Sequence, residues 1–387
     1  MNVVYLSPHF PPNYYPFCIR LHKMGVNVLG LADEPYHWLD PALRDSLTEY
    51  YRVDSMTDYG QMLRAIGYFT HRYGKIDRLD SHNEHWLETE ANLRSDFNIF
   101  GIRADHIADV TRKTCMKKVF AKAGIISAQG RIADNLKQGK QFVAETGYPV
   151  IAKPDRGVGA ADTYRINNDS ELEQFFARKP PIPYIMEEFI SGDIYTFDGL
   201  TDHEGNIVFY TSHTYSQGIM ETVNDDMDVY YYSLREIPED LETAGFSAVK
   251  AFDIRERFFH IEFFRAYETG TLMGLEINAR PPGGFTTDMF NYANDIDIYQ
   301  EWANIVTGNP FSASYSRPYH CAYVGLKSSK AYRHSHDDIL NAYGNLLVHC
   351  SDVKSIFSAA LGNFAYLIRS PNLEELLDAV RFIQKKQ

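Results

Sequence analysis

The chain of 387 residues lacks several signatures that would point directly to a class of protein. It has four cysteines without CxxC spacing, which argues against a disulfide framework and against a cysteine-based zinc site. No apolar run approaches the length of a membrane span, and the N-terminus becomes polar and broken by prolines too early for a signal peptide. The formal net charge is −13, and no basic arm or stripe is present, so a protein that binds nucleic-acid backbones is not expected. We therefore expect a cytoplasmic protein with neither a nucleic-acid nor a membrane partner.

Two familiar phosphate-binding loops are also missing. The pattern GxxxxGK[ST] occurs nowhere, and the loop at residues 7–13, between the first expected strand and helix, is not a GxGxxG turn. A P-loop is thereby excluded, and a Rossmann dinucleotide site is poorly supported. The hydrophobic fraction of 44% and the charged fraction of 23% are those of an ordinary globular protein. Because 387 residues exceed the size at which one core usually keeps growing, two or three domains are expected.

Three segments of different character follow one another along the chain. Residues 1–103 alternate buried strand-like runs with helical patterns, which predicts an open α/β unit. Residues 104–310 carry most of the charged motifs, and within them residues of about 120–192 predict a small α+β subdomain of the kind that acts as a lid. Residues 311–387 predict a small C-terminal α+β domain. The expected fold class is thus a multidomain combination of α/β and α+β units.

A predicted hairpin at residues 258–279 holds the densest set of chemical groups. Two strand-like runs flank a turn that contains Gly270, where a positive φ is expected. If the hairpin is symmetric about Thr269, Glu262 lies directly opposite Glu276, and Asn278 shares the face of Glu276.

Two carboxylates that face each other across a hairpin repel unless a cation lies between them. Glu262, Glu276 and Asn278 would present three oxygen ligands on one rigid face, and Arg280 follows two residues later. This set suits Mg²⁺ that bridges nucleotide phosphates. The alternative is a solvated hairpin face on which the charges have no special role.

Positive groups and glycines precede the hairpin. A helix at residues 111–123 carries Lys113, and a strand ending in Lys153 leads into a loop with Gly157 and Gly159. Small residues let backbone N–H groups approach phosphate oxygens closely, and a lysine adds a point charge. Taken alone, the loop could equally be an ordinary β-turn, and the helix lysines could be solvated.

The order of these motifs resembles the ATP-grasp superfamily. A helix lysine is followed by GYPVIAKP and a glycine loop, then by MEEFISGD, then by HIEFF and LEINARPPGG. The resemblance covers roughly residues 1–310. Within the superfamily, the chain is most similar to carboxylate–amine ligases with a preceding α/β domain, a group that includes the purine-pathway ligases, biotin carboxylase and amino-acid ligases. The resemblance implies an N-terminal pre-ATP-grasp domain, an ATP-grasp domain with its lid, and ATP with Mg²⁺ or Mn²⁺ as cofactors.

The resemblance also implies roles for individual residues. Lys113 and Lys153 would hold the α- and β-phosphates, with Gly157 and Gly159 in the loop above them. The adenine would lie against the segment formed by Glu187, Glu188, Phe189 and Ile190, and Asp193 would lie near the ribose. Glu262, Glu276 and Asn278 would bind the metal, and Arg280 would contact the transferred phosphate or the acyl phosphate. The chain departs from the usual pattern in two places, since Arg112 replaces an acidic residue and Asp193 replaces a glutamate.

These roles imply a ligase that joins a carboxylate to an amine. The carboxylate attacks the γ-phosphate, ADP leaves, and an amine displaces phosphate from the acyl phosphate; positioning and charge neutralisation are what such a transfer needs. The expected partners are a small carboxylate and a small amine, and a homodimer is left open. The substrate segments would be sought at residues 9–15, at Asn83 and Glu84, and at residues 211–221. A biotin-carboxylase-like enzyme and a non-catalytic ATP-binding regulator are the alternatives.

Overall fold

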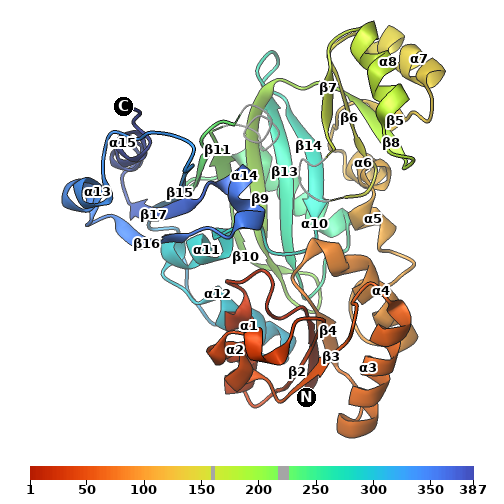
Figure 1. Ribbon diagram of the computed structural model, residues 1–387, viewed down its shortest axis with the longest axis vertical. Coiled ribbons are helices and arrows are strands. Elements are labelled where there is room, and N and C mark those ends of the chain that lie inside the picture. Colours follow the sequence, from red (N-terminus) through yellow and green to blue (C-terminus); the bar gives the residue numbers. More distant parts are fainter. Residues whose placement is uncertain (158–161, 217–225) are drawn as a thin grey trace.

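The computed structural model describes residues 1–157, 162–216 and 226–387. Three β-sheets form its framework (Figure 1). The N-terminal sheet lies at one end, a small sheet flanked by α7 (Leu136–Thr146) and α8 (Asp169–Arg178) lies at the other, and a large sheet lies between them. This arrangement confirms the expected multidomain α/β and α+β fold class.

The N-terminal sheet is parallel, with the strand order β3-β2-β1-β4. Its central strand β1 has five consecutive buried residues, as expected for a strand covered on both faces. Helix α3 begins where the Asp58 side chain accepts a hydrogen bond from the Gln61 backbone N–H, and it ends at Gly74, whose φ is 86°. The elements are β1 (Asn2–Leu6), α1 (Tyr15–Lys23), β2 (Asn27–Ala32), η1 (Tyr36–Trp38), α2 (Pro41–Ser46), β3 (Glu49–Arg52), α3 (Tyr59–Tyr73), β4 (Arg78–Asp80), η2 (Glu84–Trp86) and α4 (Leu87–Asp96).

The small sheet has the order β5-β8-β6-β7, and all of its described pairings are antiparallel. Helices α7 and α8 pack on it through a separate apolar cluster that contains Phe142, Leu172 and Tyr184. The sheet is reached through α5 (Ala108–Thr111) and α6 (Lys113–Lys122). Its strands are β5 (Gly130–Ile132), β6 (Val150–Pro154), β7 (Tyr164–Ile166) and β8 (Tyr184–Glu188).

The large sheet runs β14-β13-β9-β11-β12-β15-β17-β16, and β10 pairs with β9 away from this path. Helix α10 packs on one face, where Phe197 of β9 and Phe263 of β13 join the same apolar cluster as Val249. The elements are β9 (Gly192–Thr201), β10 (Ile207–Thr211), β11 (His213–Tyr215), β12 (Tyr230–Ser233), α10 (Glu239–Ala251), β13 (Phe258–Ala266), β14 (Leu272–Asn278), α11 (Thr286–Asn294) and α12 (Ile298–Val306).

The C-terminal strands continue this sheet rather than forming one of their own. Strand β15 pairs with β12 and with β17, so the hydrogen-bonded ladder runs without a break from the hairpin to the C-terminal segment. Helix α15 packs through a cluster containing Leu376 and Val380. The remaining elements are β15 (His320–Leu326), α13 (His336–Tyr343), β16 (Leu347–Asp352), η3 (Ser355–Phe357), α14 (Ser358–Leu361), β17 (Phe364–Ser370) and α15 (Leu373–Ile383). The predicted domain limits therefore do not coincide with a sheet boundary at residue 310.

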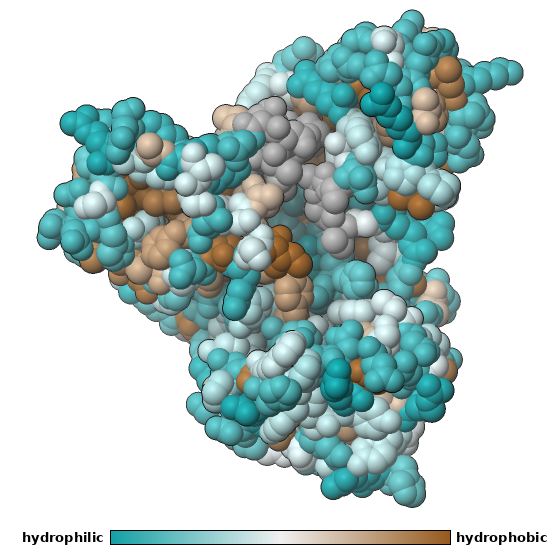
Figure 2. Space-filling model, in the orientation of Figure 1, coloured by the Kyte–Doolittle hydropathy of each residue, from teal (hydrophilic) through white to brown (hydrophobic). Residues whose placement is uncertain are grey.

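The surface is hollowed where the parts built on the three sheets meet (Figure 2). Within the described ranges, no helix combines the length and the apolar character that crossing a membrane requires.

Candidate active site

The β13–β14 hairpin places its polar groups as the alternation of strand residues predicts. Glu262 pairs with Glu276, and His260 pairs with Asn278. Beyond the glutamate pair the register shifts by one residue, so that Phe263 pairs with Gly274 and Leu275 is the extra residue of a bulge. The turn is correspondingly four residues long, from 267 to 270, and Gly270 has φ 66°. The hairpin symmetric about Thr269 thus predicts the pairing of Glu262 with Glu276 correctly, but it predicts the wrong partners for the residues between this pair and the turn.

The carboxylates of the hairpin lie beside a lysine from α6. The Lys113 Nζ is 3.4 Å from Oε2 of Glu276, and both side chains are largely buried, with 8% and 16% of their surface exposed. Burial by itself raises the pKa of Glu276, but the Lys113 and Lys153 ammonium groups outweigh burial and hold that pKa below its ordinary value. The folded protein therefore stabilises the ionised form of Glu276.

Lys153 lies at the end of β6 and is paired with Glu187 of β8, with 2.7 Å between Nζ and Oε2. Lys117 of α6 binds the other oxygen of Glu187 at 2.6 Å. Burial opposes ionisation of Lys153, but Glu187 and then Glu276 raise its pKa above the ordinary value. The two lysines likewise overcome burial and lower the pKa of Glu187. Three lysines and two carboxylates thus form one buried ionic cluster between the small sheet and the hairpin.

The loop after β6 is tied to the start of α6. The Lys113 backbone N–H donates to the carbonyl of Asp155 at 2.9 Å, and the Thr114 N–H donates to Oδ1 of Asp155 at 2.9 Å. The Lys113 ammonium donates to the carbonyl of Gly157 at 3.3 Å. Gly157 therefore does lie beside the first predicted phosphate-binding lysine. Gly159 lies outside the described residues, as do residues 217–221 of the predicted substrate segment.

Asn278 lies between two carboxylates. Its amide nitrogen, turned toward Glu84, donates to the two carboxylate oxygens at 2.7 and 2.9 Å. The opposite end of the amide then faces Oε1 of Glu276, 3.4 Å away. The amide oxygen of Asn278 and the carboxylate oxygen of Glu276 then face each other with no hydrogen bond between them, which favours a cation bound to both. Carboxylate and amide oxygens are ligands that Mg²⁺ accepts. The donor set of Glu262, Glu276 and Asn278 therefore fits that ion.

Among residues 1–157, 162–216 and 226–387, no group of three or more His, Cys, Asp or Glu side chains could hold a metal ion by itself. The amide of Asn278 is the group that makes the hairpin a candidate three-ligand site.

Arg280 is brought against Glu84, a residue of the N-terminal unit. The Nε and Nη2 atoms of Arg280 lie 3.2 and 2.6 Å from Oε2 of Glu84. Burial raises the pKa of Glu84, and the neighbouring Glu276 adds to the shift, while Arg280 opposes it. Glu84 follows the carboxyl end of β4, which is where ligand-binding loops of open α/β sheets lie.

A second buried polar group lies on the same face of β13 as Glu262. Oδ1 of Asp198 binds Nδ1 of His260 at 2.6 Å, and Oδ2 binds Nδ1 of His213 at 2.8 Å. Nε2 of His260 lies 3.1 Å from Oε1 of Glu262. Burial works against a charge on His260, but Asp198 and Glu262 raise its pKa to about 9. A charged His260 can hold Glu262 in place through its second nitrogen.

The predicted adenine segment connects the small sheet to the large one. The Glu188 N–H donates to the carbonyl of Gln129 at 3.0 Å, and its carboxylate accepts from the Gln129 N–H at 2.7 Å. Phe189 lies under the Arg165 guanidinium, 4.2 Å from the ring centre. Ile190 is half-buried two residues before β9 begins. These residues lie at the junction of the two sheets, next to Glu187.

Asp193 is the predicted site residue that the structure places elsewhere. In the pairing of β9 with β13, Asp193 lies opposite Arg265 and Asp198 lies opposite His260. The two aspartates are five residues apart on β9, and the register between them has no shift. Because strand side chains alternate, Asp193 belongs to the opposite face of the sheet, where Arg265 binds Asp240 of α10 at 2.8 Å. Its exposed carboxylate accepts a hydrogen bond from the Tyr267 hydroxyl at 2.7 Å. The geometry gives no support to the predicted ribose contact.

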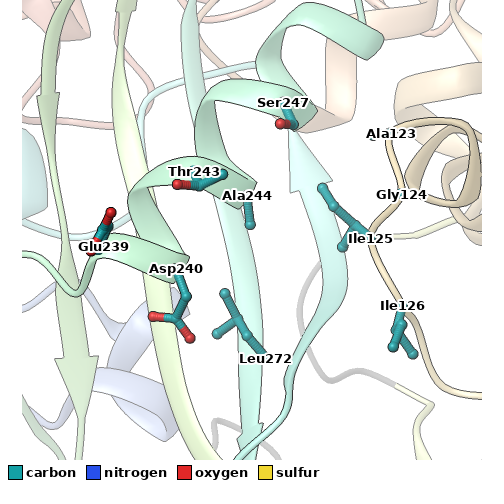
Figure 3. A pocket seen from close by; sticks show the side chains of 10 residues that line it. All are labelled: Ala123, Gly124, Ile125, Ile126, Glu239, Asp240, Thr243, Ala244, Ser247 and Leu272. Atoms are coloured by element: carbon teal, nitrogen blue, oxygen red, sulfur yellow. The ribbon is translucent and has the colours of Figure 1, made fainter.

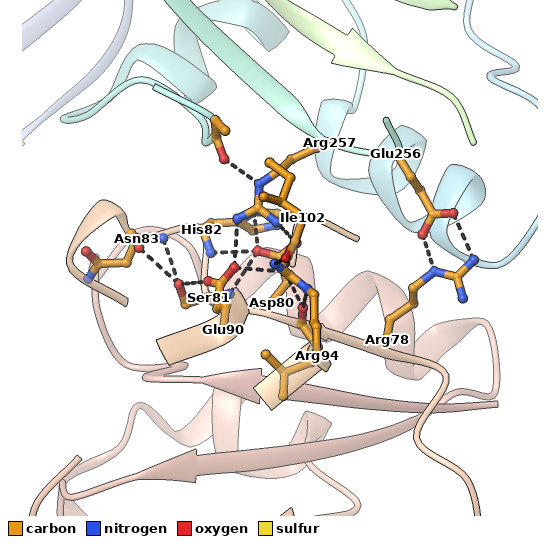
Figure 4. A network of polar contacts seen from close by, with 12 residues as sticks. Arg78, Asp80, Ser81, His82, Asn83, Glu90, Arg94, Ile102, Glu256 and Arg257 are labelled. Atoms are coloured by element: carbon orange, nitrogen blue, oxygen red, sulfur yellow. Dashed lines mark hydrogen bonds and ion pairs between the residues drawn. The ribbon is translucent and has the colours of Figure 1, made fainter. Parts of the chain in front are cut away.

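A buried ionic network joins the N-terminal unit to the hairpin (Figure 4). Nη2 of Arg257 binds Oε2 of Glu90 at 2.8 Å, and its Nη1 binds Oδ2 of Asp80 at 3.2 Å. The Nε–H of Arg257 donates to the carbonyl of Ala279, which lies between Asn278 and Arg280. Arg94 also binds Glu90, at 2.8 Å. The strand that carries the candidate metal ligands is thereby anchored to the neighbouring unit.

A surface pocket lies on the α10 side of the large sheet. Figure 3 shows it between α10, Leu272 of β14 and the segment from Ala123 to Ile126. Its volume is about 490 Å³. Leu272 pairs with Arg265, so this pocket is on the α10 face, away from Glu262 and Glu276. It is separate from the candidate active site.

Comparison with known proteins identifies a protein family in this part of the chain. A family model described as an ATP-grasp domain matches residues 181–288, the part that contains the MEEFISGD segment and the hairpin. The chain contains an ATP-grasp domain. The resemblance inferred from the motif order is thus confirmed.

The relatives of this ATP-grasp domain include ligases. The L-arginine-specific L-amino acid ligase of Bacillus subtilis is 25% identical over 279 residues, which are 70% of this chain and 65% of that protein. The crystal structure of an L-amino acid ligase from Bacillus licheniformis superposes with a TM-score of 0.75 at 15% identity, covering 98% of this chain and 96% of that one. The chain spans slightly less than two thirds of the Bacillus subtilis ligase, and matching carbamoyl phosphate synthase large chains are covered to less than a fifth.

A carboxylase shares the fold as well. The biotin carboxylase domain of the Hydrogenobacter thermophilus 2-oxoglutarate carboxylase, solved as a dimer with MgADP, ADP and bicarbonate, superposes with a TM-score of 0.70 at 17% identity. The superposition covers 98% of this chain and 88% of that one. Similarity at these identities establishes the fold that the ATP-grasp domain shares with its neighbours.

Sequence reasoning assigned no role to several charged residues of the site. Lys117 lies one helical turn after Lys113, so both face the same side of α6, a signal that the sequence does contain. His260 lies two residues before Glu262 on the same strand face and could have been found in the same way. Asp198 lies 62 residues from His260, and no local pattern marks it. Glu84 was expected in a substrate segment because it follows a strand end, but its pairing with Arg280, 196 residues away, was not.

Proposed function

We propose that the protein is an ATP-dependent ligase that joins a carboxylate to an amine through an acyl phosphate and releases ADP and phosphate. The observation that carries this proposal is the convergence, between two sheets, of an oxygen-ligand set with a row of buried cations. Glu262, Glu276 and Asn278 face Lys113 and Lys153, and Arg280 follows at the end of the same strand.

The proposal assigns each group a step in phosphoryl transfer. Glu262, Glu276 and Asn278 would hold Mg²⁺, which would supply charge neutralisation for the phosphates when bound. Lys113 and Lys153 neutralise the remaining phosphate charge. The guanidinium of Arg280 orients the substrate carboxylate, whose oxygen attacks the γ-phosphorus while the bond to ADP breaks. The amine then attacks the carbonyl carbon, and phosphate leaves with the former carboxylate oxygen.

The nucleotide has a place in this arrangement. Its adenine would lie at the junction formed by Glu187, Glu188, Phe189 and Ile190, between the lid at residues of about 120–192 and the large sheet. We also propose the division into a pre-ATP-grasp domain at 1–103, an ATP-grasp domain at 104–310 and a C-terminal domain at 311–387. ATP and Mg²⁺, for which Mn²⁺ can substitute, are the cofactors, and a homodimer is an assembly to test.

A carboxylate screen with a constant nucleophile tests the proposed reaction. The protein is incubated with ATP, Mg²⁺ and excess hydroxylamine, and a panel of amino acids and simple carboxylic acids is compared for release of ADP and formation of hydroxamate. We expect ADP and hydroxamate in equal amounts with at least one carboxylate, and neither product without a carboxylate. Stoichiometric AMP with the same substrate, or ADP release that ignores the carboxylate, would reject the proposal.

Two other functions are less well supported. A biotin-carboxylase-like enzyme would use bicarbonate as its carboxylate, and hydroxylamine would then give no stable hydroxamate. A non-catalytic ATP-binding regulator would not need the complete set of Glu262, Glu276 and Asn278 facing two lysines. The same screen separates both alternatives from the ligase.

A further inference from the structure

The guanidinium that the proposed reaction needs is already engaged. Two of its donors, on Nε and Nη2, point at a single oxygen of Glu84, at 3.2 and 2.6 Å, and Nη1 donates to the carbonyl of Pro281 at 2.8 Å. The Nε and Nη2 edge is one of the edges of an arginine that match a carboxylate in shape and spacing. Glu84 thus occupies the position that a substrate carboxylate would take.

Both partners of this ion pair are poorly accessible to water. The side chain of Arg280 is 18% exposed and that of Glu84 is 14% exposed. The Asn278 amide nitrogen also donates to Glu84, but an amide carries no charge to balance it. Arg280 is therefore the group that balances the Glu84 carboxylate most directly.

A substrate with a carboxylate alone meets an obstacle at this pair. It must compete with Glu84 for one guanidinium, and if it succeeds, it leaves a buried carboxylate without its partner close to Glu276. Removing one partner of a buried ion pair is costly because the remaining charge has lost its water as well. A substrate that brings its own cation avoids this cost, since Glu84 exchanges one positive partner for another.

We infer that the carboxylate substrate is an amino acid, whose ammonium group binds Glu84 while its carboxylate binds Arg280. This inference rests on the proposed ligase function and specifies its substrate. One intramolecular ion pair is replaced by two pairs with the ligand, so the number of buried uncompensated charges stays the same. Glu84 and Arg280 come from different units of the fold, and together they form a site for a zwitterion.

Matched substrates measure the contribution of the ammonium group directly. With hydroxylamine as the constant nucleophile, each L-amino acid that gives hydroxamate is compared with its deaminated counterpart and with its N-acetyl derivative, as in alanine, propionate and N-acetylalanine. For the wild-type protein we expect kcat/KM to be at least about tenfold higher for the free amino acid than for either analogue, as the loss of one charge-assisted contact implies.

The variant Glu84→Gln tests whether Glu84 causes this preference. Its amide oxygen can still accept a hydrogen bond from Arg280, but the negative charge is gone. We expect the ratio of kcat/KM between amino acid and deaminated acid to fall roughly ten- to a hundredfold, mainly through KM of the amino acid. Asp96→Asn is the matched control, because Asp96 is an exposed acid at the end of α4 that contacts Tyr59, and its ratio should match the wild type.

The outcomes distinguish this inference from the proposed function. If no carboxylate yields ADP and hydroxamate, the ligase proposal itself fails. If hydroxamate forms but propionate serves as well as alanine, or if Glu84→Gln keeps the wild-type ratio, the ligase stands and the zwitterion site is wrong. If Glu84→Gln does not fold, the wild-type comparison of free, deaminated and acetylated substrates decides the question alone.

Discussion

Replacing Glu276 by glutamine tests the electrostatics of the site without any ligand. Two facing glutamates predict repulsion, so that removing one would stabilise the protein. The structure reverses this expectation, because Lys113 lies 3.4 Å from Glu276 and Lys153 acts on it as well. Despite burial, the pKa of Glu276 is held below its ordinary value, which means that the folded state favours the ionised form.

The expected loss of stability in Glu276→Gln follows from the burial of Glu276 and from its contact with Lys113. Both side chains are less than a fifth exposed, so the discount for solvent screening is small. A hydrogen-bonded contact to a charged group contributes about 1.5–3 kcal/mol, and we expect Glu276→Gln to lower the free energy of unfolding by about this amount at pH 7.5. Glu268→Gln is the matched control, since Glu268 is an exposed carboxylate in the turn of the same hairpin. We expect it to change the free energy of unfolding by less than about 0.5 kcal/mol.

The pH dependence of the stability of Glu276→Gln tests this reasoning. A carboxylate whose pKa is depressed in the folded state stabilises the protein above its unfolded pKa of about 4.3, and this contribution is lost as the pH falls through the folded pKa. Urea unfolding of wild type and both variants, followed by tryptophan fluorescence, should therefore show a deficit for Glu276→Gln at pH 7.5 that shrinks below pH 4. If Glu276→Gln is as stable as the wild type at pH 7.5, or more stable, repulsion from Glu262 dominates and the reasoning is wrong.

Three further changes probe other parts of the site. Lys153→Ala should weaken ATP binding roughly ten- to a hundredfold through the loss of one charge-assisted contact, and unchanged affinity by calorimetry would remove this lysine from the phosphate site. Arg280→Lys should lower turnover much more than ATP affinity, because an ammonium cannot reproduce two parallel donors; wild-type turnover would contradict this role. Arg257→Met should lower the free energy of unfolding by about 3–5 kcal/mol in urea, because it strips a partner from the fully buried Glu90. The exposed Arg255→Met should change it by less than about 0.5 kcal/mol, and equal effects would show that the network contributes little.

Local patterns in the sequence were enough for the hairpin and for the class of fold. The alternation of strand residues has a period of two, and the turn glycine marks where the chain reverses, so the pairing of Glu262 with Glu276 could be predicted from spacing alone. Lys153 and Gly157 were predicted for a similar reason, since a strand followed by small residues has a recognisable pattern. The order of such motifs sufficed to indicate an ATP-grasp domain.

Tertiary structure decided which charges meet. The sequence contains no signal for the bulge at Leu275, which depends on how β14 packs, and counting residues from the turn therefore gave the wrong ladder below the glutamates. Asp193 was assigned from the resemblance of its motif to the ATP-grasp pattern, but the alternation of β9 puts it on the face covered by α10.

Glu84 illustrates the limit most clearly. It lies 196 residues before Arg280, in the segment that follows β4 of the N-terminal sheet. Its contact with Arg280 exists because the N-terminal unit is anchored to the hairpin through Arg257. Periodicity reports which residues share a face of one element, since that depends on local backbone geometry. It carries no information on which faces of distant elements are brought together, because that depends on how the buried surfaces of whole units fit one another.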